Sequence, residues 1–231
     1  PPLFFLMIRR PPRSTLFPYT TLFRSQYEIM KKILSILTVL CICGISAFAQ
    51  NTAPKENIMK DKKVLVAFFS RTGENYNVGN ISKGNTHIIA EMIAGETNGK
   101  LFQIEPVKPY PDEYRACVDI AKTEKENKAR PAVKEDIAAE DYDVIFLGYP
   151  NWWGDMPMAV YTFIEKHDWN GKTVIPFCTH EGSGLSGTER LLEQACKGAT
   201  IAKGLAVQGT TAQNSQAQAK KTVQSWLNKL K

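Results

Sequence analysis

The chain has 231 residues, with 29 Lys and Arg against 23 Asp and Glu, a formal net charge of +6, and five cysteines. Six of the basic residues and one acidic residue lie before residue 50, so the rest of the chain carries a net charge of only +1. That near-neutral body argues against a surface for nucleic acid or a polybasic membrane anchor.

The first 25 residues show neither helical nor strand periodicity and resemble a sequencing adaptor translated in frame. We therefore expect residues 1–29 to be a non-native leader and Met30 to be the true start of the protein. A genuine disordered basic arm is the alternative.

A secretory signal is expected over residues 30–49. Lys31 and Lys32 form its charged end, residues 33–45 are apolar but too few to span a bilayer, and Ala47-Phe48-Ala49 is a small-residue cleavage motif. We expect cleavage after Ala49 and export to the periplasm, with no stable membrane anchor afterwards. An uncleaved membrane tether is the alternative.

Three cysteines remain after removal of the signal, at Cys117, Cys178 and Cys196. An odd number without a Cys-x-x-Cys pair argues against a disulfide framework, a zinc site or a redox dithiol. We expect small core residues, Cys178 on a strand and the other two on helices, and the sequence leaves open whether one pair is oxidised.

The remaining chain predicts a flexible lead-in at residues 50–61 and one domain at 62–231. Short apolar runs of the kind found in buried parallel strands predict five strands. Pro176 interrupts the fourth run and predicts a bulge or a local break in pairing. The five predicted strands are residues 64–69, 101–104, 144–148, 173–178 and 205–207.

Helical periodicity follows each of these strands. The helix after the second strand is expected at about 112–128, with Asp112 as its cap. Three other helices are expected to begin near residues 85, 157 and 188, and a last amphipathic helix is expected to close the chain with Ala219, Val223, Leu227 and Leu230 facing in. Strands alternating with helices predict an α/β fold with a parallel sheet covered on both faces.

The loop after the first strand combines hydroxyls, a guanidinium and glycine with a helix start. Ser70-Arg71-Thr72-Gly73 follows the strand, and Asn85 and Thr86 begin the helix. Hydroxyls and unpaired helix-start amides attract a phosphate. The alternative is an ordinary strand-to-helix turn with a serine cap.

This loop resembles the Ser/Thr-x-Thr-Gly-Asn-Thr turn of the flavodoxin family, with residues 74–84 inserted between its halves. The Pro-x-Trp-Trp-Gly string at residues 150–154 is the most specific part of the resemblance. It implies a three-layer, doubly wound, five-stranded parallel sheet in the order 2-1-3-4-5. The loops after strands 1, 3 and 4 then meet at the carboxyl edge, where FMN is expected.

The resemblance assigns each loop a part of FMN. The phosphate is expected at Ser70, Arg71, Thr72, Gly73, Asn85 and Thr86. The isoalloxazine ring is expected at Pro150, Asn151, Trp152, Trp153 and Gly154. Its other edge is expected at Thr179, Glu181, Gly182, Ser183 and Gly184.

Simpler roles are expected for several conspicuous side chains. One of the two tryptophans should pack under the following helix, and Glu181 should be a hydrogen-bond acceptor or a solvated charge rather than a catalytic base. His180 is expected on a loop surface, and His87 and His167 on helix surfaces. Neither a metal site nor a catalytic residue is assigned, because no histidines have metal-ligand spacing.

The function expected from these residues is one- or two-electron transfer by an exported FMN protein, to a redox partner protein or a small electron acceptor. An FMN-dependent NAD(P)H or quinone reductase is one alternative. A non-redox binding module on the same fold is the other.

Overall fold

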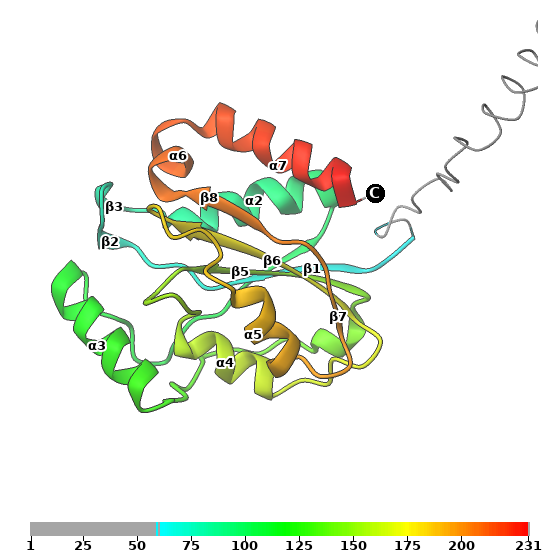
Figure 1. Ribbon diagram of the computed structural model, residues 1–231, viewed down its shortest axis with the longest axis horizontal. Coiled ribbons are helices and arrows are strands. Elements are labelled where there is room, and N and C mark those ends of the chain that lie inside the picture. The colour runs from blue at the N-terminus through cyan, green and yellow to red at the C-terminus, as the bar shows by residue number, and fades with distance from the viewer. Residues whose placement is uncertain (1–58, 60, 231) are drawn as a thin grey trace, which may run out of the picture. The chain divides into compact units, whose positions relative to one another are not determined.

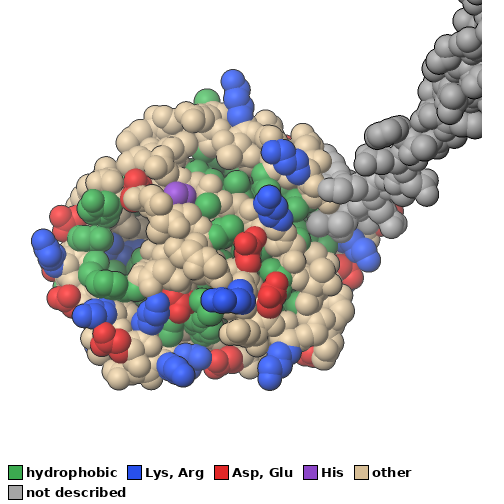
Figure 2. All heavy atoms as spheres, viewed as in Figure 1, with side chains coloured by type: hydrophobic (Ala, Val, Ile, Leu, Met, Phe, Trp, Pro, Cys, Tyr) green, Lys and Arg blue, Asp and Glu red, His purple; other side chains and the backbone are tan. Residues whose placement is uncertain are grey.

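The computed structural model describes residues 59 and 61–230 (Figure 1). The predicted leader, the signal and most of the lead-in lie outside these residues. Within the described part of the chain, the helices are too short or too polar to cross a bilayer. Charged side chains of both signs are interspersed over the face shown in Figure 2.

The centre of the fold is a parallel sheet in which β4 (Lys100–Gln103), β1 (Val64–Phe68), β5 (Val144–Pro150) and β6 (Thr173–His180) lie side by side. All five residues of β1 are buried, as are the first six residues of β5. Burial on both faces explains why these strands are uninterrupted apolar runs.

The last position of the sheet is divided between two short strands. β7 (Thr200–Ile201) pairs with Thr173 and Val174, and β8 (Leu205–Gln208) pairs with the residues from Phe177 onward. Pro176, which has no amide hydrogen to donate, falls between the two paired stretches. The order 2-1-3-4-5 is found, but β7 and β8 divide the fifth position, so the sheet has six strands rather than the predicted five. The predicted break in pairing lies on this side only, because Pro176 stays in register with Leu147 of β5.

Helices cover both faces of the sheet (Figure 1). One apolar core lies between the sheet and the helices on one side, and a second core lies on the other. α6 (Gly209–Asn214) is a short helix that the sequence did not predict. The face of the sheet that includes Val66 and Phe68 is covered by α2 (Asn85–Thr97), α6 and α7 (Gln216–Leu230). The opposite face, which includes Leu65 and Ala67, is on the side of α3 (Tyr114–Glu126), α4 (Met158–Glu165) and α5 (Thr188–Ala195) (Figure 1).

The start of α3 differs from the prediction. Its cap is Glu113, not Asp112, because the Glu113 carboxylate accepts hydrogen bonds from the amides of Arg115 and Ala116 at 2.9 and 2.8 Å. The carbonyl of Asp112 instead accepts a hydrogen bond from the amide of Glu74.

The environment of His167 also differs from the prediction. Its side chain is only 6% exposed, with the ring 4.7 Å from that of Phe163. Both ring nitrogens face carboxylates, at 3.0 Å from Asp136 and 3.2 Å from Glu140. Glu140 belongs to the short 3-10 helix η1 (Ala139–Asp141), which directly precedes β5.

Candidate functional site

Three loops that are far apart in the sequence meet at the carboxyl edge of the sheet. The hydroxyls of Thr86 and Thr179 share a buried hydrogen bond of 2.7 Å. The side-chain amide of Asn151 donates to the carbonyl of Gly184 at 2.9 Å, and its backbone amide donates to the carbonyl of Thr179 at 2.8 Å. The structure therefore brings together the three predicted loops.

The loop after β1 prepares the start of α2 for an anion. Gly84, the N-cap, has no side chain to cap the helix, and no acidic residue lies in the first turn. The Ser70 hydroxyl accepts a hydrogen bond from the amide of His87 at 3.1 Å. The amides of Asn85 and Thr86 lie at the positive end of the helix dipole and need an acceptor from outside the helix.

The Arg71 side chain already donates hydrogen bonds to backbone carbonyls. Its guanidinium donates to Pro111 at 2.8 Å, Asp112 at 2.7 Å and Glu74 at 2.6 Å. These bonds join the loop after β1 to the segment before α3. Arg71 therefore stabilises the position of the loop after β1. A direct bond from Arg71 to phosphate requires the loss of some of these contacts.

The predicted insertion, residues 74–84, begins as an antiparallel hairpin of β2 (Gly73–Asn75) and β3 (Gly79–Ile81). Gly73 has a φ of +79°, and a Cβ there would lie 2.7 Å from the carboxylate of Asp112. Glycine is therefore required where the hairpin approaches the segment before α3. Neither short strand has the apolar alternation that would reveal it in the sequence.

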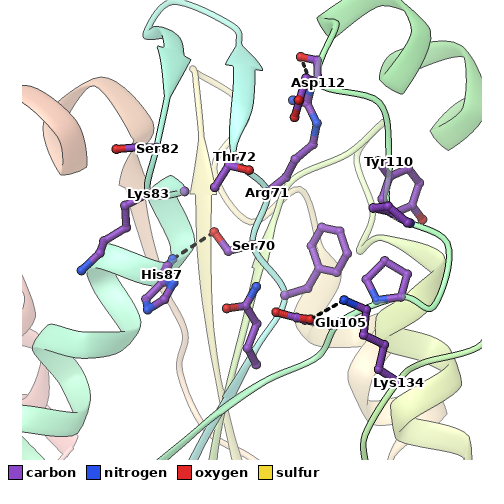
Figure 3. Close-up of a pocket in the computed structure, with 15 residues that line it drawn as sticks. Ser70, Arg71, Thr72, Ser82, Lys83, His87, Glu105, Tyr110, Asp112 and Lys134 are labelled. Atoms are coloured by element: carbon purple, nitrogen blue, oxygen red, sulfur yellow. Dashed lines mark hydrogen bonds and ion pairs between the residues drawn. The ribbon is translucent and has the colours of Figure 1, made fainter.

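A polar cavity of about 430 Å³ lies beside this loop (Figure 3). Ser70, Thr72 and Lys83 lie on one side, with Glu105 and Lys134 opposite. The latter two form an ion pair at 2.9 Å.

His87 also lines this cavity. Burial lowers the pKa of its imidazole, Glu91 opposes that shift and Lys83 adds to it. The ring lies 4.8 Å from that of Phe68, so His87 is half-buried rather than on the helix surface as predicted.

The Trp loop is a tight two-residue turn. Trp152 and Asp155 exchange two backbone hydrogen bonds at 2.9 and 3.0 Å, and the residues between them, Trp153 and Gly154, have φ values of +57° and +74°. Positive φ at both central positions is the pattern of a type I′ turn. It is strained for an indole side chain, and such strain clusters at functional sites.

The two indoles have different environments. Trp152 is half-buried, with its ring edge-on to Phe69 at 5.3 Å and to Tyr110 at 5.0 Å. Trp153 is 51% exposed and donates from its ring nitrogen to the carbonyl of Val118 at 3.3 Å. Trp152 is the packed tryptophan, but it packs against Phe69 and Tyr110 rather than under the following helix, α4, as predicted.

The third loop follows β6 and presents open backbone. Gly182 and Gly184 have φ values of +121° and +61°, and nothing lies within 4 Å of where a Cβ would be. Ser183 and Gly182 are exposed, and the Ser183 carbonyl accepts a hydrogen bond from Ser186 at 2.9 Å. Pro150 ends β5 and pairs with Thr179 in register.

Glu181 and Asn85 connect the site to α6. The carboxylate of Glu181 accepts hydrogen bonds from the amide and the hydroxyl of Thr210 at 2.7 and 3.3 Å. Gln213 donates to the side-chain oxygen of Asn85 at 2.8 Å. The expected acceptor role of Glu181 is confirmed, whereas Thr210 and Gln213 gave no signal in the sequence.

The donor set suits a ligand that combines an anion with a flat ring. Hydroxyls and helix-start amides bind phosphate without a buried countercharge. An exposed indole beside bare glycine backbone lets a flat heterocycle approach closely. The residues present therefore fit the group that the resemblance implies.

Comparison with known proteins agrees with this geometry. The flavodoxin family model matches residues 63–230. A putative flavoprotein from Bacteroides uniformis ATCC 8492 is 30% identical, with 72% of this chain and 97% of that chain covered and a TM-score of 0.58. One from Bacteroides eggerthii DSM 20697 is 29% identical, with 73% and 98% covered and a TM-score of 0.56.

A flavoprotein from Lactobacillus acidophilus NCFM, solved in complex with FMN, is 22% identical, with 65% of this chain and 95% of that chain covered and a TM-score of 0.50. That likeness shows the fold alone. No curated protein matches the chain. The family match spans the whole described sheet and all three loops, and the chain therefore belongs to the flavodoxin family.

Proposed function

We propose that this protein binds FMN and acts in one- or two-electron transfer. The observation that carries the proposal is the junction of the three loops, linked through Thr86, Thr179 and Asn151. Membership of the flavodoxin family and the FMN complex of the Lactobacillus flavoprotein support FMN as the ligand. Bound FMN supplies one- and two-electron redox chemistry that the amino-acid side chains here lack.

The phosphate site is proposed at the start of α2. The hydroxyls of Ser70 and Thr72 donate to the anion, together with the amides of Asn85 and Thr86. A Cβ on Gly84 would lie 2.1 Å from the Ser70 hydroxyl oxygen, so this close approach of loop and helix needs glycine. The same residues hold the dianion without a buried cation.

The ring site is proposed between the Trp loop and the loop after β6. Residues 150–154 provide the exposed indole of Trp153 and the turn at Gly154, and residues 182–184 provide backbone amides. Asn151 connects the two loops through its bond to Gly184. The backbone of the two loops orients the ring relative to the sheet edge.

FMN binding is tested by titrating the flavin-free protein with FMN and with riboflavin, which lacks the phosphate. We expect FMN to bind more tightly, and Ser70→Ala and Thr72→Ala to weaken FMN by about tenfold while leaving riboflavin unchanged. A protein fraction that is colourless after FMN has been added and the free flavin removed overturns the proposal.

The electron-transfer role is tested with the FMN-loaded protein. We expect it to accept electrons from a chemical reductant and pass them to a one-electron acceptor such as ferricyanide, without sustained oxidation of NADPH. Steady-state NADPH oxidation with a quinone as acceptor would instead establish the reductase alternative.

We propose export on the basis of the signal-like sequence of residues 30–49 alone. Expression from Met30 in a bacterium with a periplasm should give a mature protein that begins at Gln50 and is found in the periplasmic fraction. An intact Met30 N-terminus in the cytoplasmic or membrane fraction contradicts export or cleavage.

A further inference from the structure

A second cavity, of about 290 Å³, lies on the other side of the Trp loop. It is enclosed by the loop that follows β1, the face of α3 that carries Cys117 and Ala121, and the indoles of Trp152 and Trp153. Figure 2 shows hydrophobic side chains around a hollow at the left of the view, over the hairpin and α3. Its lining residues include Asn75, Tyr114, Cys117, Val118, Trp152 and Trp153.

The mouth of this cavity carries exposed aromatic side chains. Tyr76 and Trp153 are 56% and 51% exposed, and the only other large hydrophobic side chain so exposed in the described residues is Val107. The Tyr76 ring stacks on that of Tyr114, with centroids 6.0 Å apart and an interplanar angle of 27°. Exposed aromatic area gathered at a hollow indicates a binding surface.

The polar groups of the cavity are already satisfied or neutral. The Arg71 guanidinium is bonded to three backbone carbonyls, and the Asn75 amide donates to the carbonyls of Thr72 and Gly73. Burial raises the pKa of the Cys117 thiol to about 11, so the thiol stays neutral. Arg71 is the only charged side chain among the lining residues, and because its guanidinium is already bonded to backbone carbonyls, the lining favours an uncharged ligand.

We propose that this cavity binds an uncharged planar aromatic electron acceptor of the quinone class. The inference rests on the proposed function, because Asn151, Trp152 and Trp153 line both the cavity and the proposed ring site. A flat, neutral ring stacks on Tyr114 or Trp153 without desolvating a charge. Reduction of the quinone to the hydroquinone takes two electrons and one proton from the reduced flavin (FMNH⁻), which returns to FMN, and the second proton from water.

The cavity is tested with the FMN-loaded protein, reduced with dithionite and mixed rapidly with menadione. We expect the oxidation rate to saturate with menadione concentration, because the quinone binds before it reacts. Val118→Phe fills the cavity and should abolish saturation, and Tyr114→Leu should raise the half-saturating concentration about threefold to tenfold. Thr123→Phe, an equal enlargement on the exposed face of α3, should behave as the wild type.

Ferricyanide, an anionic acceptor that needs no aromatic pocket, should oxidise all four proteins at the same rate. A linear dependence on menadione in the wild type, or saturation unchanged in Val118→Phe, overturns the inference. Loss of FMN binding in Val118→Phe also overturns it, because the cavity then belongs to the flavin.

A failure of the proposed FMN function can be told apart from a failure of the cavity proposal. If the wild type binds no FMN, quenching of tryptophan fluorescence by menadione still tests the cavity on the flavin-free protein. Quenching that saturates in the wild type and Thr123→Phe but not in Val118→Phe supports the site, and equal quenching in all three contradicts it.

Discussion

Thr86 and Thr179, 93 positions apart in the sequence, share a buried hydrogen bond of 2.7 Å between their side-chain hydroxyls. Thr86 lies in the first turn of α2, and Thr179 lies near the end of β6. The bond fixes the proposed phosphate loop against the loop expected at the flavin edge. The spacing between the two ends of the cofactor site therefore depends on this pair.

The two hydroxyls of the pair should not contribute independently to the stability of the protein. Thr86→Val leaves the Thr179 hydroxyl buried without its partner, and we expect a loss of about 1–3 kcal/mol in the free energy of unfolding. The double variant Thr86→Val with Thr179→Val should lose less than the sum of the single changes, because no polar group is then unsatisfied.

Urea unfolding of the four proteins measures these differences. Thr222→Val, on the exposed surface of α7, is the matched control and should change the free energy of unfolding by less than about 0.5 kcal/mol. If the loss in free energy of unfolding in the double variant equals the sum of the two single losses, the two hydroxyls contribute independently.

Gly84, the N-cap of α2, and Gly95, inside the helix, should respond to alanine in opposite directions. At Gly84 the new Cβ would lie 2.1 Å from the Ser70 hydroxyl oxygen and 2.5 Å from the Arg71 carbonyl, so the loop must move. We expect Gly84→Ala to destabilise the protein and to weaken FMN binding by about tenfold or more. At Gly95 nothing lies within 4 Å, and alanine should stabilise the helix by about 0.5–1 kcal/mol.

Thermal unfolding and FMN titration of both variants test this contrast. Tight FMN binding by Gly84→Ala would mean that the proposed phosphate site does not need the close approach of loop and helix.

The sequence predicted the sheet well because its central strands are buried on both faces. The side chains of β1 are buried throughout, so its apolar run has few other interpretations. Pro176 likewise indicated the place where the edge strand divides. These signals are local, since each depends on the residue type and its immediate neighbours.

The features that the sequence did not reveal depend on contacts between distant segments. Arg71 contacts carbonyls about 40 positions away, which made it resemble a free phosphate ligand until the fold was known. α6 has the sequence Gly-Thr-Thr-Ala-Gln-Asn, with no apolar stripe, and is connected to Asn85 and Glu181 through Gln213 and Thr210. Tertiary contacts outweigh local propensity at such sites.

The three cysteines of the domain should resist alkylation in the native protein. Burial raises the pKa of Cys117 to about 11, and it raises the pKa values of Cys178 and Cys196 to about 12. The structure shows all three as free thiols. Because the thiolate is the reactive form, iodoacetamide at pH 8 should label them slowly.

Mass spectrometry of the labelled peptides checks this expectation residue by residue. Cys117 should react first, because it lines the aromatic cavity, and Val118→Phe should slow it further. All three should react rapidly in urea. Absence of alkylation at two of them in urea would indicate a disulfide instead.

The cluster around His167 should make the protein sensitive to acid. Both ring nitrogens face carboxylates, Nε2 at 3.0 Å from Asp136 and Nδ1 at 3.2 Å from Glu140, and only the imidazolium can donate through both. Burial tends to raise the pKa of Asp136, but hydrogen bonds from Lys166 and His167 outweigh it and lower that pKa. Burial likewise opposes the lowering at Glu140, where backbone amides and His167 prevail.

A carboxylate whose pKa is lower in the folded than in the unfolded protein stabilises the fold above its ordinary pKa. The ordinary values here are 3.8 for Asp136 and 4.5 for Glu140, so the stabilisation should be fully present above about pH 5.5 and lost as the pH falls through and below these values. We expect the free energy of unfolding in urea to fall between pH 5.5 and pH 3, and to fall less in Asp136→Asn.

Asp119→Asn, which removes an exposed carboxylate of α3 that has no ion pair within the described residues, should retain the wild-type pH dependence. Identical acid profiles for Asp136→Asn and the wild type would show that the His167 cluster does not set the acid limit of this fold.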